Sequence, residues 1–277
     1  MSLYIASLNS GSNGNCYYIG NNREAVLIDA GLSCKETERR LRNLGLSIAN
    51  VKAIFISHEH IDHIKGMQGI TNKHEIPIYI TPLTLQYCRT QLPDNLVRTF
   101  KPYEQVRVGG LTVIPFPKQH DGIDPYSFNI EGNGVTIGVY TDIGAPCDHL
   151  IANFKKCHAA FLEANYDEIM LEYGSYPAHL KKRIKGGKGH LSNRQAFDFF
   201  TTHRPPHLTH LLLAHLSKNN NKPEIVAELF KPCTPDTNVI IASRFNETEV
   251  YRITGNNTMQ FTEHTAPPEK MVQATLF

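Results

Sequence analysis

The chain lacks several features that would place it outside the cell or in a membrane. No apolar run approaches the ~20 residues that a membrane helix needs. Residues 1–15 contain no basic segment followed by an apolar one, so we expect no secretory leader. The six cysteines form no Cys-x-x-Cys pair, which argues against a disulfide framework or a cysteine zinc site. These absences predict a cytoplasmic protein with no membrane partner.

Strong net charge is also absent, with 28 basic residues against 26 acidic ones and a net charge of +2. No global field therefore draws the chain to nucleic acid, and any such attraction must come from a local patch. Apolar residues make up 41% of the 277 residues, enough to bury a compact core. We expect one domain over residues 1–254 and a polar, proline-containing tail over 255–277. The one compositional oddity is the 14 histidines.

Apolar periodicity and turn residues predict strands in hairpins near the start, then strands alternating with helices. Predicted strands are 4–8, 16–19, 25–28, 51–56, 76–80, 106–108, 111–116, 126–130, 135–140, 238–242 and 248–253. Predicted helices are 35–45, 83–91, 178–184, 192–201 and 222–230, with Ser192 placed to cap the fourth. This mixture favours a layered domain with helices outside the sheets.

Four apolar runs lead into a potential metal ligand: His58, His120 with Asp121, Asp142, and His215. Ligand sites in open α/β sheets collect beyond the strand ends, so these residues are expected to converge. Simpler readings stay open for three positions. In these readings His120 is an exposed loop residue, Asp142 is a turn residue or a helix cap, and His215 is a core histidine.

The densest cluster is the His-x-His-x-Asp-His run from His58 to His63. One ion cannot bind all of these side chains in a comfortable geometry, whereas two ions can. His58 and His60 would then bind one ion, and Asp62 and His63 the other. Imidazole and carboxylate ligands suit Zn, Mn, Fe or Ni better than Ca or Mg. The alternative is a solvated, histidine-rich loop.

This run, together with Asp29 in a Leu-Ile-Asp-Ala-Gly segment, resembles the metallo-β-lactamase fold superfamily. Further motifs resemble its YycJ/WalJ-like metallohydrolase (exonuclease) subfamily, and the resemblance extends to about Tyr251. The motifs are SGSNGN at 10–15, HEHIDHIKG at 58–66, HD at 120–121 with DP at 124–125, TD at 141–142, LEANYD at 162–167, GHLSN at 189–193 and AHLS at 214–217. The resemblance implies an α+β fold, an αββα four-layer sandwich with two facing mixed β-sheets.

The resemblance also implies two divalent metal ions, with Zn or Mn favoured and Fe or Ni open. By motif match the first ion would be held by His58, His60 and His120, the second by Asp62, His63 and His215, and Asp142 would bridge them. Asp29 occupies the place of a supporting acid that orients a ligand. A metal-bridging hydroxide would be the nucleophile, oriented by Asp62.

His190 is similar to a histidine that protonates the leaving group in nuclease branches of the superfamily, and Glu163 lies in the supporting acidic motif. The alternative is that His190 merely precedes the helix cap. Five basic residues in 181–188 form a local patch suited to a phosphodiester backbone, with Lys181, Arg183 and Lys188 as candidate contacts. The alternative for this run is a solvated face.

The glycine-rich loop near the start contains three further candidate contacts to a phosphate, Ser10, Asn13 and Asn15. A turn that uses Asn and Gly for backbone reasons is as good a reading. The last residues resemble short peptides that dock on the bacterial DNA sliding clamp, through Gln273, Leu276 and Phe277. The alternative is a terminus that folds back on its own domain.

These observations together favour a dinuclear metal-dependent phosphodiesterase acting on DNA, a 5′-exonuclease of replication or repair. A hydrolase of a small ester, thioester or cyclic nucleotide is the alternative enzyme. A metal-stabilised interaction module is the non-enzymatic alternative, although structural zinc usually has four ligands and this set has seven. The sequence predicts no oligomeric state.

Overall fold

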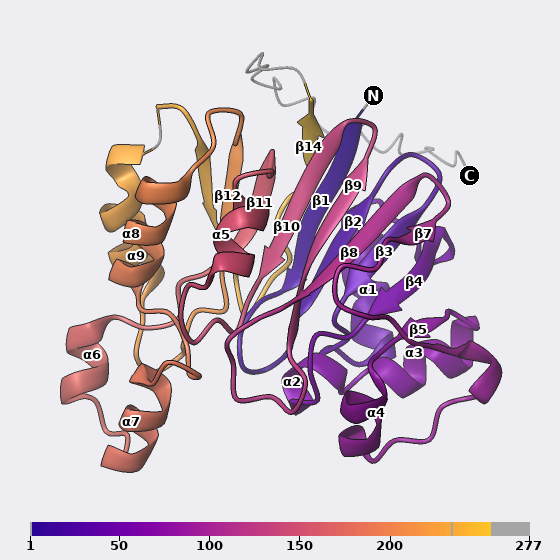
Figure 1. The fold of residues 1–277 in the computed structure, drawn as a ribbon, viewed down its shortest axis with the longest axis horizontal. Helices are drawn as coiled ribbons and strands as arrows, with labels where there is room; N and C mark the ends of the chain where they lie inside the picture. Colours follow the sequence, from indigo (N-terminus) through magenta and orange to yellow (C-terminus); the bar gives the residue numbers. More distant parts are fainter. Residues whose placement is uncertain (1, 234, 256–277) are drawn as a thin grey trace, which may run out of the picture.

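The computed structural model describes residues 2–233 and 235–255. Two seven-stranded sheets lie face to face, and helices cover the outer side of each (Figure 1). Both sheets contain parallel and antiparallel pairs. The structure therefore confirms the α+β sandwich with two facing mixed sheets.

The first sheet is antiparallel at the chain's start and parallel further along, in the order β14-β1-β2-β3-β4-β5-β6. Its strands are β1 (Ser2–Asn9), β2 (Cys16–Gly20), β3 (Ala25–Ile28), β4 (Val51–Phe55), β5 (Ile78–Tyr79), β6 (Val97–Arg98) and β14 (Tyr251–Thr254). The second sheet has the order β13-β12-β11-β10-β9-β8-β7. Its strands are β7 (Val106–Val108), β8 (Leu111–Pro117), β9 (Tyr126–Gly132), β10 (Val135–Tyr140), β11 (Ala159–Glu163), β12 (His210–Ala214) and β13 (Asn238–Ile241).

Three helices cover each sheet, and three others lie elsewhere. Over the first sheet lie α1 (Cys34–Asn43), α3 (Met67–His74) and α4 (Pro82–Cys88). Over the second lie α5 (Asp148–Phe154), α8 (Asn193–His203) and α9 (Pro223–Phe230). The remaining helices are α2 (Ile61–Ile64), α6 (Glu168–Tyr173) and α7 (Ala178–Lys185), with 3₁₀ turns at Ile48–Asn50, Asp94–Leu96 and Lys231–Cys233.

The structure also corrects the predicted elements. The strand expected at 76–80 shrinks to β5, where Pro77 just before it has no N–H to donate. The strand expected at 248–253 begins only at Tyr251. Strand β11 escaped prediction because its Ala, Leu and Glu residues favour a helix when read alone. Ser192 caps α8 as expected, in a reciprocal pair of hydrogen bonds with Gln195.

The core follows the alternation of side chains along each strand. One face of each sheet contributes to a shared cluster between the sheets, in which Tyr17 of β2 and Phe161 of β11 have ring centroids 4.8 Å apart. The opposite faces pack against the outer helices. Within residues 2–233 and 235–255, no helix has the length and apolar content that crossing a membrane requires.

Strand direction brings the predicted ligands together. Strands β3 and β4 are parallel in the first sheet, and β10, β11 and β12 are parallel in the second. Strand β8 runs the same way as β10, because both are antiparallel to β9. The carboxyl ends of each parallel set therefore meet at one edge of the sandwich, and that edge positions the candidate site.

Replacing Phe161 with alanine tests the packing between the sheets. The ring is fully buried, so we expect the free energy of unfolding to fall by about 3–5 kcal/mol in urea denaturation. The matched control is Phe245→Ala, because that side chain is 65% exposed and its loss should cost under about 0.5 kcal/mol. Equal losses for the two variants would contradict the assigned core.

Candidate metal centre

Three candidate site residues lie just beyond strand ends and have left-handed backbone conformations. Asp29 follows β3 with φ 62°, Asp142 comes two residues after β10 with φ 56°, and His215 follows β12 with φ 57°. Such conformations cost of order 1 kcal/mol or more for non-glycine residues and persist where the surroundings impose them. They concentrate at functional sites, and here all three lie at the same edge.

The first predicted ligand group is assembled as expected. His58 Nε2 lies 3.0 Å from His60 Nδ1, which lies 3.4 Å from His120 Nε2. One ligand atom from each of the three residues lies within 4.8 Å of the others. His58 and His120 are buried, and His60 has a side chain 30% exposed. Three imidazole nitrogens around one point form a donor set suited to a transition metal.

The second group forms beside it from Asp62, His63 and His215. Asp62 Oδ2 lies 3.5 Å from His63 Nε2 and 3.4 Å from His215 Nε2. The loop after β3 holds this segment in place. A Cβ on Gly31 would lie 1.8 Å from the carbonyl oxygen of Asp62, so only glycine permits this approach.

Asp142 lies between the two groups. Its Oδ2 is 3.2 Å from His63 Nε2, and its Oδ1 is 3.9 Å from His120 Nε2 and 3.5 Å from His215 Nδ1. Apart from the ion pair with His63, the buried Asp142 Oδ2 has no hydrogen-bond partner among the described residues. A buried carboxylate oxygen with so few partners is costly unless something else binds it. The residues present therefore fit two divalent ions that share Asp142.

Polar partners hold the outer ring nitrogens of four of these histidines. The pairs are His58 Nδ1 with Ser57 Oγ at 2.9 Å, His63 Nδ1 with Asp29 Oδ2 at 2.7 Å, His120 Nδ1 with the Gly189 carbonyl at 3.0 Å, and His215 Nδ1 with Glu163 Oε1 at 3.0 Å. Such bonds fix the ring orientation and leave the other nitrogen as the ligand atom. Asp29 thus has the contacts that a supporting acid requires, and it also accepts hydrogen bonds from Ser57.

Burial and charge set the protonation of the cluster in opposite directions. Burial lowers the pKa of His58 well below its usual value and lowers that of His120 to about 3. Burial acts the same way on His63 and His215, but the carboxylates around each ring, Asp142 first among them, together outweigh it. The pKa of His63 is raised well above its usual value, and that of His215 to about 10. The first group is therefore ready to bind a cation, and the second holds protons that a cation must displace.

Glu163 and His190 are brought together as predicted. Glu163 Oε1 lies 2.8 Å from His190 Nδ1, and Glu163 Oε2 accepts hydrogen bonds from the backbone N–H groups of Ile143 and Leu191. Burial raises the pKa of Glu163, but His190 and its hydrogen bond lower it to about 2. A buried carboxylate thus orients a histidine whose side chain is 16% exposed.

Two of the three candidate phosphate contacts in the glycine-rich loop are directed into the protein. Ser10 is buried, and its hydroxyl accepts a hydrogen bond from the His215 N–H at 2.7 Å. Asn15 is also buried and donates to Asp62 Oδ2 at 3.1 Å. Of the three candidate contacts, Asn13 alone is exposed, and its amide donates to the Arg244 carbonyl. Ser10 and Asn15 therefore support the second ligand group where we expected phosphate contacts.

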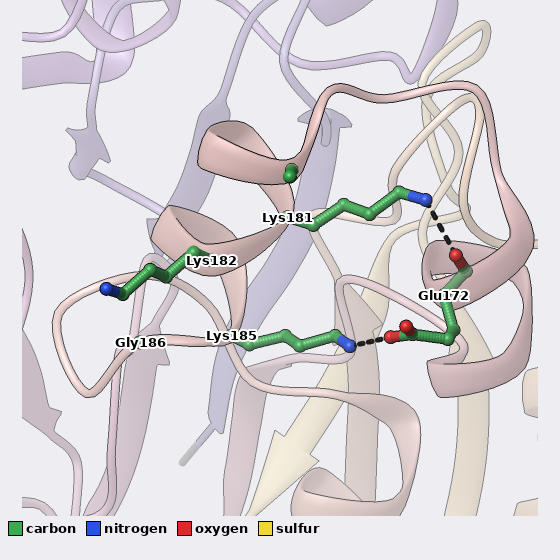
Figure 2. Close-up of a pocket in the computed structure, with 6 residues that line it drawn as sticks. Glu172, Lys181, Lys182, Lys185 and Gly186 are labelled. Carbon is green, nitrogen blue, oxygen red and sulfur yellow. Dashed lines mark hydrogen bonds and ion pairs between the residues drawn. The ribbon is translucent and has the colours of Figure 1, made fainter.

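The basic run divides into paired and unpaired side chains. Lys181 donates to the Glu172 carbonyl at 2.6 Å, and Lys185 pairs with the Glu172 carboxylate (Figure 2). Arg183 Nε donates to Asp121 Oδ2 at 2.5 Å. The candidate contacts Lys181 and Arg183 are therefore already engaged.

Two exposed lysines of the run have no ion-pair partner among the described residues. Lys188, the third candidate contact, has no polar side-chain partner in the described part of the chain, and Lys182 points away from Glu172 in Figure 2.

Sequence reasoning missed three supporting residues. The Ser57 hydroxyl forms hydrogen bonds with both Asp29 and His58. Its position directly before the ligand run is a signal from which this role could have been predicted. Asn165 donates to the His215 carbonyl at 2.7 Å. Lys118 is buried and donates to the Thr141 carbonyl at 2.8 Å, beside Asp142. Neither of these two contacts has a local sequence signature. The candidate residues Gln273, Leu276 and Phe277 lie outside the described residues.

Comparison with known proteins identifies the family of the chain. Residues 24–215 match the beta-lactamase superfamily domain. The chain is 32% identical to exodeoxyribonuclease YycJ of Bacillus anthracis, over 81% of this chain and 86% of that protein. It is 29% identical to exodeoxyribonuclease WalJ of Streptococcus pneumoniae, over 79% and 83%.

Solved structures share the fold at low identity. The metallo-β-lactamase fold protein YhfI from Bacillus subtilis has a TM-score of 0.70 at 16% identity, covering 91% of this chain and 99% of that one. The short form of human tRNase Z has a TM-score of 0.62 at 17% identity, covering 90% and 99%. The chain therefore belongs to the beta-lactamase superfamily and has the metallo-β-lactamase fold. It is a hydrolase of that superfamily, similar in sequence to YycJ and WalJ, and the fold implies divalent metal ions.

Replacing Asp29 with asparagine tests whether the outer hydrogen bonds tune metal binding. The variant keeps a side chain that tolerates the left-handed backbone but removes the charge against His63. We expect Zn²⁺ affinity to fall about 10–100-fold in isothermal titration calorimetry. The exposed Asp198→Asn is the control and should bind like the wild type. Unchanged affinity in Asp29→Asn would contradict the supporting role.

The raised pKa values of His63 and His215 predict a pH dependence of metal binding. Since a cation binds only the neutral rings, the ion of the second group displaces protons from His63 and His215, and its affinity should rise with pH from 6 to 8. The slope should be about tenfold per pH unit for each proton released. Calorimetry in two buffers of different ionisation enthalpy counts those protons. An affinity that is flat over this range would contradict the assigned protonation.

Proposed function

We propose that the chain is a dinuclear metal-dependent phosphodiesterase that acts on DNA as a 5′-exonuclease, in replication or repair. One observation carries this proposal: a buried carboxylate, Glu163, is bonded both to a ligand-group histidine, His215, and to the partly exposed His190. A general acid is thereby held beside the two ligand groups. The YycJ and WalJ relatives, both named exodeoxyribonucleases, support the choice of substrate.

The donor set supports a proposed place for each of two ions. His58, His60 and His120 would hold one, Asp62, His63 and His215 the other, with Asp142 shared. When bound, two such ions supply water activation and neutralise charge on phosphoryl oxygens. The chain's own residues orient the reaction. Asp62 accepts a hydrogen bond from Asn15, which aims its carboxylate at the centre.

His190 is placed to protonate the leaving oxygen. Its Nδ1 lies 2.8 Å from the Glu163 carboxylate, which accepts a hydrogen bond from Nδ1–H and leaves Nε2–H free to donate its proton. Glu163 in turn is fixed by two backbone N–H donors, so the ring cannot swing freely. The sugar oxygen that leaves the phosphorus atom receives this proton. The cleaved strand therefore departs as an alcohol.

The cellular location of the enzyme and a protein partner can be proposed as well. We propose that the enzyme works in the cytoplasm and that the peptide 273–277 docks on the DNA sliding clamp through Gln273, Leu276 and Phe277. Deletion of 273–277 should abolish clamp binding measured by calorimetry. Unchanged clamp affinity after the deletion would contradict this part.

Hydrolysis of an end-labelled, 5′-phosphorylated DNA duplex tests the proposed activity. With Mn²⁺ or Zn²⁺ we expect progressive loss of nucleotides from the 5′ end. His190→Gln should lower kcat about 10²–10⁴-fold, because general acid catalysis contributes that range. Metal content should be unchanged in this variant, since His190 lies outside both ligand groups.

His203→Gln is the control, since this histidine at the end of α8 has no part in the site. Absence of DNA cleavage by a fully metal-loaded chain would contradict the nuclease proposal. Turnover of small esters, thioesters or cyclic nucleotides in that case would establish the alternative hydrolase.

A further inference from the structure

Helices α6 and α7 and the loop after them form an arm, residues 166–188, beside the candidate metal centre. In Figure 1 the two helices project from the sandwich below α8 and α9. The arm has a small apolar cluster of its own, in which Leu171 and Ile184 are buried. Its last loop leads to Gly189, whose carbonyl lies 3.0 Å from His120 Nδ1. The arm is thus anchored at the first ligand group.

Glu172 binds two of the lysines of the arm. It engages Lys181 through its carbonyl and Lys185 through its carboxylate, so both cations lie between the helices (Figure 2). Lys182 is directed to the other side of α7 and has no polar side-chain partner within the described residues. Lys182 and Lys185 line a hollow of about 490 Å³. Lys182 therefore contributes to the hollow, while its ammonium group is directed away from Glu172 and is not neutralised by it.

Large apolar side chains of α6 are exposed next to these cations. Ile169 is 70% exposed and Tyr173 is 87% exposed, one helical turn apart. Both line a second hollow of about 380 Å³. The two hollows are neighbours, because Glu172 and Lys185 line both. An open aromatic ring and a free cation thus lie on one continuous surface.

Lys188 extends this surface toward the centre. It is exposed, and its Cα packs close to Gly144, two residues after Asp142. His190 follows two residues later. A strand that contacts Lys182 and then Lys188 is therefore led toward the proposed general acid.

We propose that the arm binds an unpaired nucleic-acid strand, with phosphates at Lys182 and Lys188 and a base stacked on Tyr173. This inference rests on the proposed function and specifies where the substrate strand lies. Charge complementarity carries it, because cations that follow the backbone and aromatic rings that stack on bases are the two components of single-strand binding. A duplex end offers the same phosphates but no free base face for Tyr173.

Binding of a fluorescein-labelled single-stranded oligonucleotide, measured by anisotropy without divalent ions, tests the arm. Tyr173→Ala should weaken binding about tenfold, and Tyr173→Phe should restore it, because stacking needs the ring and not the hydroxyl. Lys182→Gln should weaken binding and flatten the slope of log Kd against log salt by about 0.7, the value for one phosphate contact on a single strand. A loss of folding would not change that slope selectively.

Tyr87→Ala on α4 and Lys35→Gln on α1 are the matched controls, both at exposed positions, and should bind like the wild type. Wild-type affinity and slope in the Tyr173 and Lys182 variants would overturn the proposal, as would equal losses in the controls. Equal affinity for a blunt duplex would overturn the role of the unpaired base.

The same variants separate this inference from the proposed function. Oligonucleotide cleavage with an unchanged KM in Lys182→Gln and Tyr173→Ala would overturn the arm while leaving the nuclease intact. Binding that depends on Lys182 and Tyr173, without cleavage of any strand, would support the arm and overturn the nuclease. If both proposals hold, KM for the oligonucleotide rises in these variants and kcat stays the same.

Discussion

The structure depends on one electrostatic constraint, the collection of buried histidines and carboxylates at a single edge of the sandwich. Asp142 is central to it, because its charge raises the pKa of both His63 and His215 while one of its own oxygens has no hydrogen-bond partner among the described residues. Buried charges of this kind are costly unless they are paired or bind a metal. The fold is thus a scaffold whose site is completed by cations.

Backbone strain and outer hydrogen bonds hold this arrangement together. The left-handed conformations of Asp29, Asp142 and His215 occur where strands end, and each residue is bonded or packed within the cluster. Gly31 allows the loop after β3 to approach Asp62 closely enough to fix the second ligand group. Precision in such a site comes from these supporting contacts as much as from the ligands themselves.

The ligand cluster could be predicted from the sequence because its signal is local. The His58–His63 run, His120, Asp142 and His215 each come after an apolar strand, and strand direction brings the strand ends together. The supporting contacts could not be predicted, because they join distant segments: Lys118 reaches Thr141, and Asn165 reaches His215. The basic run shows the same limit. Its composition was visible, but only the fold shows that Asp121 engages Arg183 while Lys182 has no polar side-chain partner among the described residues.

The central claim is that two ligand groups share Asp142 and hold two ions close together. Electron paramagnetic resonance of the Mn²⁺-loaded protein, with metal content measured on the same sample, tests it most directly. The account predicts about two Mn²⁺ per chain and an exchange-coupled spectrum that Asp142→Ala abolishes. One Mn²⁺ per chain with an isolated-ion spectrum, unchanged by Asp142→Ala, would contradict it.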